Sequence, residues 1–125
     1  MKYIIGLILL VSFTGCASAR PWTTGEKVMA GASILASFAD AYTTCGALNN
    51  PNNSEANPIM GKRPSNGRVI VTIGLSELIA LGVSHWYPVV DFPLIGKVNM
   101  RYGFLGMKTV INTGCAINNS RLDWD

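Results

Sequence analysis

The sequence predicts an all-α fold: a small membrane-associated bundle of three helices that follows an N-terminal signal helix. Hydrophobic residues make up 49% of the 125 residues and charged residues only 14%, which is well below the quarter that is usual in soluble domains. Long apolar segments at about 24–46, 67–87 and 93–118 supply the helices, and polar or proline-containing stretches separate them. The length suits one domain.

The composition also excludes several classes of protein. A disordered chain needs high charge and few apolar groups, which is the reverse of this composition. The net charge of +3 is small and scattered along the chain, so no nucleic-acid partner is expected. The mean hydropathy of +0.30 points toward a membrane.

The first nineteen residues have the layout of a bacterial secretory signal. Lys2 gives a positive start, an apolar run covers 3–11, and small and polar residues fill 12–19. The apolar run is shorter than the roughly 20 residues that a spanning helix needs. We therefore expect this segment to direct export.

Two cleavage sites compete in this segment. The sequence Phe-Thr-Gly-Cys at 13–16 resembles a lipobox, which predicts a signal peptide at 1–15 and a lipid attached to Cys16. The alternatives are ordinary cleavage after Ala19, at an A-x-A site, and an uncleaved anchor. In the leading interpretation, 16–125 forms a single helical membrane domain with a periplasmic N-terminus.

The first apolar segment has a clear start and a single internal charge. Thr23 and Glu26 have the spacing of a capping box. Between residues 28 and 48 the only charged side chain is Asp40. This stretch of about 21 residues makes a helix of about 31 Å, which is long enough to cross a bilayer.

The second segment repeats this pattern. Ser65 or Asn66 can cap it, and Glu77 is the only charge between residues 69 and 84. Trp86 and Tyr87 follow, as in the aromatic belts of membrane interfaces.

The third segment is the most polar. Asp91 is its expected cap and Pro93 suits its first turn. It carries Lys97, Arg101 and Lys108, which must face protein or a polar cavity if the segment spans.

Basic residues predict the orientation of the helices. The loop between the first two segments contains Lys62 and Arg63, and Arg68 begins the second segment. The positive-inside rule makes this loop cytoplasmic if both segments span. The same orientation follows from an exported N-terminus.

Polar residues recur on one face of each predicted helix. On the first segment they are Ser33, Ser37, Asp40 and Thr44, and on the third they are Lys97, Arg101, Lys108 and Asn112. Counting from the predicted helix starts places Asp40 level with Lys108, and Glu77 between Arg101 and Lys108. We therefore expect a buried polar seam with the ion pairs Asp40–Lys108 and Glu77–Arg101.

The seam has three interpretations. We favour a role in holding the helices together. Alternatively, Asp40, Glu77 or His85 lines a path for ions or small molecules, because ionisable groups inside membranes are functional candidates. In the third interpretation the bundle is water-exposed and the polar faces meet solvent.

The motifs of common active sites are absent from the sequence. It contains neither phosphate-binding glycine pattern, and its one histidine, His85, cannot build a zinc site of the usual spacing. We therefore predict neither an enzyme nor a cofactor or metal. Cys45 and Cys115 can pair in an exported protein, but we favour two unpaired thiols buried in helices.

The sequence from Asp40 to Thr44, followed by Glu-Ala-Asn-Pro-Ile-Met-Gly at 55–61, resembles a pattern found in an uncharacterised family of small bacterial integral-membrane proteins. The resemblance extends through 61–65, covers about 35 residues, and implies a membrane fold but no reaction. Asn57-Pro58 favours a structural turn. The alternative is a site made of Asp40, Thr44, Glu55 and Asn57, whose oxygens suit a hard cation.

These observations predict a bacterial or phage-encoded protein of the cell envelope with a structural or interaction role. Its expected partners are membrane lipid and either another envelope protein or a second copy of the chain. One rival is an ion- or small-molecule-binding membrane protein that uses Asp40 and Glu77. The other is a peripheral lipoprotein whose helices do not span.

Overall fold

The computed structural model describes residues 20–122. The expected signal peptide at 1–15, the lipid-bearing Cys16 and the alternative cleavage after Ala19 lie outside these residues. The described elements are α2 (Thr24–Ala47), α3 (Asn66–Ser84), β1 (Val89–Phe92), β2 (Gly96–Asn99) and α4 (Met100–Ser120). The three predicted helices are present, and a small antiparallel sheet accompanies them.

Helix α2 begins where its capping box predicts. The backbone amide of Glu26 donates to Thr23 Oγ1 at 3.3 Å. In return, Glu26 Oε2 accepts from the backbone amide of Thr23 at 2.8 Å. These reciprocal bonds satisfy two of the free donors of the first turn. The helix ends at Ala47, one residue beyond the predicted end.

Helix α3 begins after Ser65, whose hydroxyl accepts from the amide of Arg68 at 3.3 Å. Its last helical residue is Ser84, so the predicted end at residue 87 was three residues too late. The amides of Trp86 and Tyr87 bond to carbonyls only three residues back. Pro88 then disfavours the helical conformation at Tyr87, because it restricts the preceding residue.

The third predicted helix is wrong in its first seven residues. Residues 89–99 form a hairpin in which Val90 pairs with Val98 and Phe92 with Gly96. Gly96 has φ +75°, a left-handed conformation that suits the end of a three-residue hairpin loop. Pro93 begins that loop instead of a helix.

Helix α4 therefore starts at Met100 and is capped by Asn99 rather than Asp91. Asn99 Oδ1 accepts from the amides of Arg101 at 3.1 Å and Tyr102 at 3.4 Å. Lys97 lies in β2, so it is not part of the basic face of α4.

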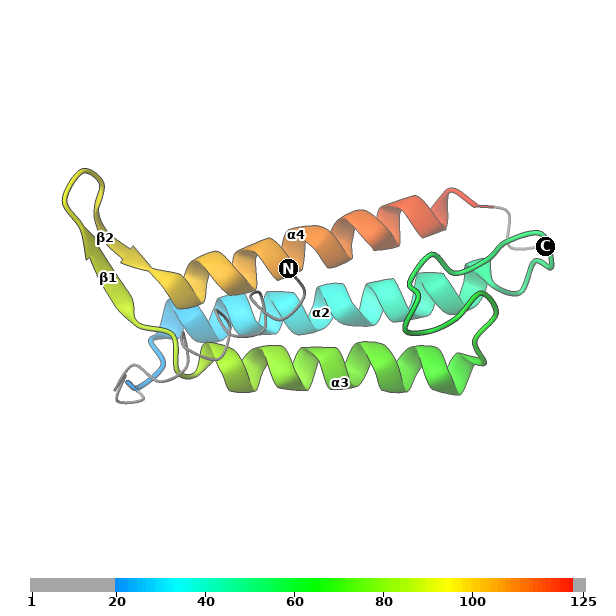
Figure 1. Cartoon of the computed structure of the whole chain (residues 1–125), viewed down its shortest axis with the longest axis horizontal. Coiled ribbons are helices and arrows are strands. Elements are labelled where there is room, and N and C mark those ends of the chain that lie inside the picture. Colours follow the sequence, from blue (N-terminus) through cyan, green and yellow to red (C-terminus); the bar gives the residue numbers. More distant parts are fainter. Residues whose placement is uncertain (1–19, 123–125) are drawn as a thin grey trace, which may run out of the picture.

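The helices form an elongated bundle in which α2 lies between α3 and α4 (Figure 1). Helices α2 and α4 run in the same direction and pack most extensively, while α3 runs opposite to both. The 48–65 loop lies at one end of the bundle, here called the loop end. The hairpin projects from the other end, the hairpin end.

The bundle buries polar side chains and exposes large apolar ones. Leu35 on α2, Leu78 on α3 and Val110 on α4 are 71%, 66% and 71% exposed. The buried polar and charged residues of the helices are Glu26, Ser33, Ser37, Thr44, Glu77, Ser84, Arg101 and Asn112. This distribution is the reverse of that in a water-soluble helical bundle, whose apolar stripes face the core.

A small apolar core does form near the loop end. Ala41 of α2, Val69 and Ile73 of α3, and Met60 of the loop are all buried and in contact. Met60 thereby fastens the 48–65 loop to the two helices that it connects.

Candidate functional site

The buried polar residues lie at three levels along the bundle. We call them the hairpin-end cluster around Glu26 and Arg101, the middle network around Glu77, and the loop-end pocket around Asp40. At each level a hydrogen bond joins α4 to α2: Arg101 to Glu26, Asn112 to Ser37, and Asn119 to Thr44.

These three hydrogen bonds share one register, because each joins residues that are 75 positions apart. Along each helix the steps are 11 and 7 residues. At 3.6 residues per turn, 11 residues overshoot three turns slightly and 7 fall slightly short of two. The two deviations cancel, so the polar contacts follow one nearly straight line between the parallel helices.

Arg101 organises the hairpin-end cluster. Its side chain is 0% exposed and forms an ion pair with Glu26 at 3.1 Å. Its remaining donors bond to the carbonyl of Ser84 at 2.9 Å and that of His85 at 2.7 Å. The guanidinium also lies 4.5 Å from the ring centroid of Trp22. One side chain therefore ties α4 to α2, to the end of α3, and to the segment before α2.

Glu26 is the acceptor at the centre of this cluster. It pairs with Arg20 and Arg101 and accepts from Asn99 Nδ2 at 2.8 Å. Burial alone would raise the pKa of Glu26, but hydrogen bonds from Arg20, the Thr23 amide and Asn99 outweigh that effect. The pKa of Glu26 is consequently held well below its usual range, and the carboxylate stays ionised.

His85 lies beside this cluster and contacts both Trp22 and Arg101. Trp22 Nε1 donates to His85 Nδ1 at 2.8 Å, and the two rings stack with centroids 6.3 Å apart. The interpretation of His85 as part of an ion path finds no support in this geometry. Trp22 occupies its Nδ1 atom, and the carbonyl of His85 holds Arg101.

The middle network is built around the buried carboxylate of Glu77. Both carboxylate oxygens of Glu77 are engaged: Ser33 donates to one at 2.8 Å, and Ser37 donates to the other at 2.6 Å. Lys108 forms an ion pair with Glu77 at 2.9 Å. Asn112 donates to Ser37 Oγ at 2.6 Å. This network joins all three helices and engages both carboxylate oxygens of Glu77.

The predicted ion pairs are therefore wrong in their partners. Glu77 pairs with Lys108 rather than Arg101, and Arg101 pairs with Glu26. Asp40, expected to pair with Lys108, accepts only from neutral donors, Thr44 at 3.4 Å and Asn119 at 3.5 Å. The prediction that polar residues meet in the interior is nevertheless correct for Thr44, Glu77, Arg101 and Lys108, while Asp40 is half-buried.

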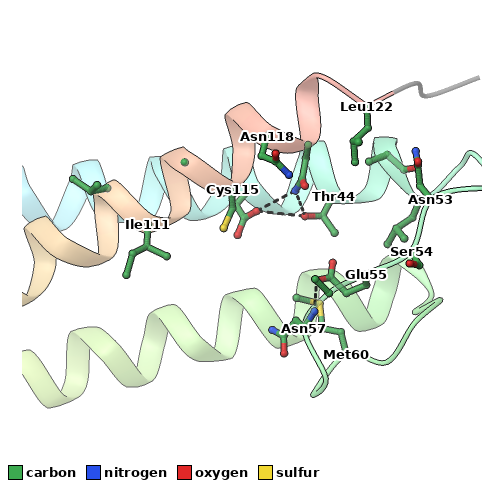
Figure 2. Close-up of a pocket in the computed structure, with 17 residues that line it drawn as sticks. Thr44, Asn53, Ser54, Glu55, Asn57, Met60, Ile111, Cys115, Asn118 and Leu122 are labelled. Atoms are coloured by element: carbon green, nitrogen blue, oxygen red, sulfur yellow. Dashed lines mark hydrogen bonds between the residues drawn. The ribbon is translucent and has the colours of Figure 1, made fainter.

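The loop-end pocket has a volume of about 490 Å³ and is formed by α2, α4 and the 48–65 loop. Asp40 and Thr44 line it from α2, and Glu55 and Asn57 line it from the loop. Figure 2 shows Thr44 and Cys115 on the helix side and Glu55, Asn57 and Met60 on the loop side. The four residues proposed as a loop site are thus brought together.

The loop that carries Glu55 is held by its own hydrogen bonds. Glu55 Oε1 accepts from the amide of Asn57 at 2.8 Å, and Asn57 Oδ1 accepts from the amide of Ile59 at 3.0 Å. The amide of Glu55 donates to the carbonyl of Lys62 at 2.9 Å. Asn57 therefore makes the structural turn that its sequence favours, and it also lines the pocket.

The pocket does not resemble a metal centre. Within residues 20–122, no group of three or more His, Cys, Asp or Glu side chains is arranged to hold a metal ion. A hard cation such as Ca²⁺ needs six to eight oxygens at about 2.3–2.6 Å. The pocket is lined by two carboxylates, by the neutral polar side chains of Thr44, Asn53, Ser54, Asn57, Asn118 and Asn119, and by apolar side chains that include Leu48, Met60 and Ile111.

The two cysteines of this region are separate. Cys45 and Cys115 are both free, as favoured from the sequence, but they are not buried. Cys45 is half-buried and lines a groove between α2 and α3, whereas Cys115 is exposed and lines the loop-end pocket.

Several residues at these levels were not predicted. Arg20, Trp22 and Asn99 complete the hairpin-end cluster, and Asn119 completes the loop-end level. Asn119 follows Asn112 by seven residues on the same face, which is a signal that could have identified it. Arg20, Trp22 and Asn99 come from outside the helices, so no helical spacing marks them.

No protein-family model, curated protein or solved structure matches this chain at a significant level. The interpretation of the site therefore depends on its geometry, and membership of the family of small bacterial membrane proteins stays a prediction.

Proposed function

We propose that the chain is a small membrane protein of the bacterial or phage cell envelope, anchored by a lipid on Cys16, with a structural or interaction role rather than a catalytic one. One observation carries the proposal. The helices turn many large apolar side chains outward, while the charged side chains of Glu26, Glu77 and Arg101 and several hydroxyl groups are buried inside. In water this arrangement exposes apolar surface on every helix, whereas in a bilayer it is favourable.

The apolar surface is spread over all three helices. Besides those of Leu35, Leu78 and Val110, the exposed large side chains include Val28, Phe38 and Tyr42 on α2, Ile70, Val71, Leu75 and Ile79 on α3, and Met107, Ile111 and Ile117 on α4. In the described part of the chain, α3 alone is long and apolar enough to cross a membrane by length and composition. Four charged side chains of α2 and α4 are buried or half-buried, which supports spans for these helices too: Glu26, Asp40, Arg101 and Lys108.

The directions of the helices determine which segments share a side in the proposed topology. Helices α2 and α4 are parallel, so the 48–65 loop and the end of α4 lie on one side. Lys62 and Arg63 lie in that loop, which favours a cytoplasmic location for the loop end under the positive-inside rule. The hairpin end, with Trp86, is then periplasmic.

Reporter fusions at Asn53, Trp86 and Asp125 test this topology. We expect cytoplasmic signals at Asn53 and Asp125 and a periplasmic signal at Trp86. Periplasmic signals at all three positions would replace the proposal with a peripheral lipoprotein.

Carbonate extraction of the Cys16→Ser variant separates the lipid anchor from the helices. Retention in the membrane is expected if the helices span. Release into the soluble fraction would contradict the spans.

A further inference from the structure

The loop-end pocket has features of a ligand site that are not explained by a role in holding the helices together. Its volume of about 490 Å³ lies within the range of about 300–1,000 Å³ typical of small-molecule sites. Three elements contribute to its walls, which combine apolar side chains with two carboxylates from different elements, Asp40 and Glu55.

The charge of the pocket is unbalanced. Asp40 from α2 and Glu55 from the loop line the same pocket, so their like charges repel each other. Among the described residues, no lysine or arginine lines the pocket. Lys108, whose charge also acts on Asp40, makes its ion pair with Glu77 in the middle network. The pocket is therefore negative and open to a cation.

The two carboxylates also keep acceptor capacity. Asp40 receives two long hydrogen bonds, both from neutral donors. Glu55 Oε1 receives one bond from the amide of Asn57. An ionised carboxylate offers about four acceptor positions, so a charged donor can be added without displacing these contacts.

We propose that the loop-end pocket binds a small organic cation, an ammonium group carried on a short apolar body. The ammonium group lies between Asp40 and Glu55, and the apolar body packs against Leu48, Met60 and Ile111. A bare metal ion fits less well, because within residues 20–122 no group of three or more His, Cys, Asp or Glu side chains is arranged to hold one. This inference does not depend on whether the helices span a membrane.

The free cysteines supply an internal comparison that needs no mutation. Cys115 lines the pocket, whereas Cys45 lies outside it. Methanethiosulfonate reagents with a trimethylammonium or a sulfonate group are applied to the purified full chain, and modification of each thiol is followed by peptide mass spectrometry. We expect the ratio of cationic to anionic rates to be about tenfold higher at Cys115, since opposite charges attract strongly at low salt. Equal ratios at the two thiols would overturn the proposal.

Protection experiments test binding directly. Phenethylammonium should protect Cys115, but not Cys45, from N-ethylmaleimide in a saturable manner. The uncharged analogue 2-phenylethanol should protect much less, and so should Ca²⁺. Equal protection by the uncharged analogue or by Ca²⁺, or no saturable protection by phenethylammonium, would contradict a site for an organic cation.

Substitutions assign the effect to the two carboxylates. Asp40→Asn or Glu55→Gln should weaken protection by phenethylammonium about tenfold, because each removes a charge-assisted contact. Asp91→Asn is the matched control, since it removes the same charge from an exposed position on the hairpin. Unchanged protection in both pocket variants would refute the assignment. If a variant does not fold, the comparison of Cys115 with Cys45 in the unsubstituted chain still tests whether the pocket attracts cations.

Discussion

Arg101 and Glu26 form a buried ion pair, and each of the two side chains also makes several further polar contacts. Arg101 contacts a carboxylate, three backbone carbonyls and an aromatic face, which a lysine could not reproduce in one geometry. Burying a charge is costly unless it is paired and hydrogen-bonded. The density of partners explains how a fully buried guanidinium is accommodated at the first turn of α4.

The depressed pKa of Glu26 predicts an acid-sensitive fold. Ionised Glu26 stabilises the folded state at neutral pH, and this contribution is lost as the pH falls below the ordinary glutamate pKa of about 4.3 toward the folded value. The Glu26→Gln variant should be less stable at neutral pH by about 3 kcal/mol, because Arg101 loses its charged partner. It should also lose part of the acid dependence.

The measurement is the free energy of unfolding in detergent micelles as a function of pH. Asp91→Asn, which removes an exposed carboxylate on the hairpin, should keep the acid dependence of the natural chain. An identical acid slope for the natural chain and Glu26→Gln would show that Glu26 does not contribute to it.

At the scale of elements, local signals correctly predicted the starts and caps of α2 and α3, but not those of α4. The capping box at Thr23 and the serine cap at Ser65 use only neighbouring residues, so they can be identified without tertiary structure. The hairpin was missed because Pro93 suits the first turn of a helix and the start of a turn equally. Pairing of β1 with β2 favours the hairpin over a helix at Pro93, and this pairing involves residues on both sides of the loop.

That single error also misassigned the ion pairs. The predicted depth of Lys108 was counted from Pro93, but α4 begins at Met100. The difference of seven residues is about two helical turns, which moves Lys108 away from the level of Asp40 and toward Glu77. Helical spacing predicted which face carries the polar residues, but not how far each helix is shifted along its neighbour.

The corrected pairing predicts a specific energetic coupling between α3 and α4. Lys108→Met should destabilise the fold by about 3–5 kcal/mol, because Glu77 is left as a buried, uncompensated charge. Adding Glu77→Gln should restore much of this stability, since the amide keeps the size of the side chain and can still accept from Ser33 or Ser37. Adding Asp40→Asn instead should restore little.

A double-mutant cycle on unfolding free energies measures this coupling. The Glu77–Lys108 cycle should give a coupling of at least about 1 kcal/mol, and the Asp40–Lys108 cycle a smaller one. A larger coupling for Asp40–Lys108 would reinstate the pairing expected from helix spacing alone.

At the scale of the whole molecule, the proposed bilayer would explain both the buried polar contacts and the exposed apolar side chains. Three α2–α4 hydrogen bonds in a single register join the two parallel helices, alongside buried apolar residues such as Ala36 and Leu105. Lipid tails provide no hydrophobic drive for helices to associate, so packing and interhelical hydrogen bonds must do so. Apolar side chains are then free to cover the outside.

A charge placed on the outer, apolar surface of the bundle should lower the amount of inserted protein if lipid surrounds that surface, but not if water does. Leu78 is 66% exposed near the middle of α3. In a bilayer, Leu78→Lys should cost about 2.5–3.5 kcal/mol of insertion free energy and sharply lower the amount of membrane-inserted protein. The matched control is Leu94→Lys at the tip of the hairpin, where the side chain is 96% exposed, and it should leave that amount nearly unchanged. Quantitative blots of membrane and soluble fractions give the answer: if Leu78→Lys accumulates normally or becomes more soluble, water rather than lipid surrounds the bundle.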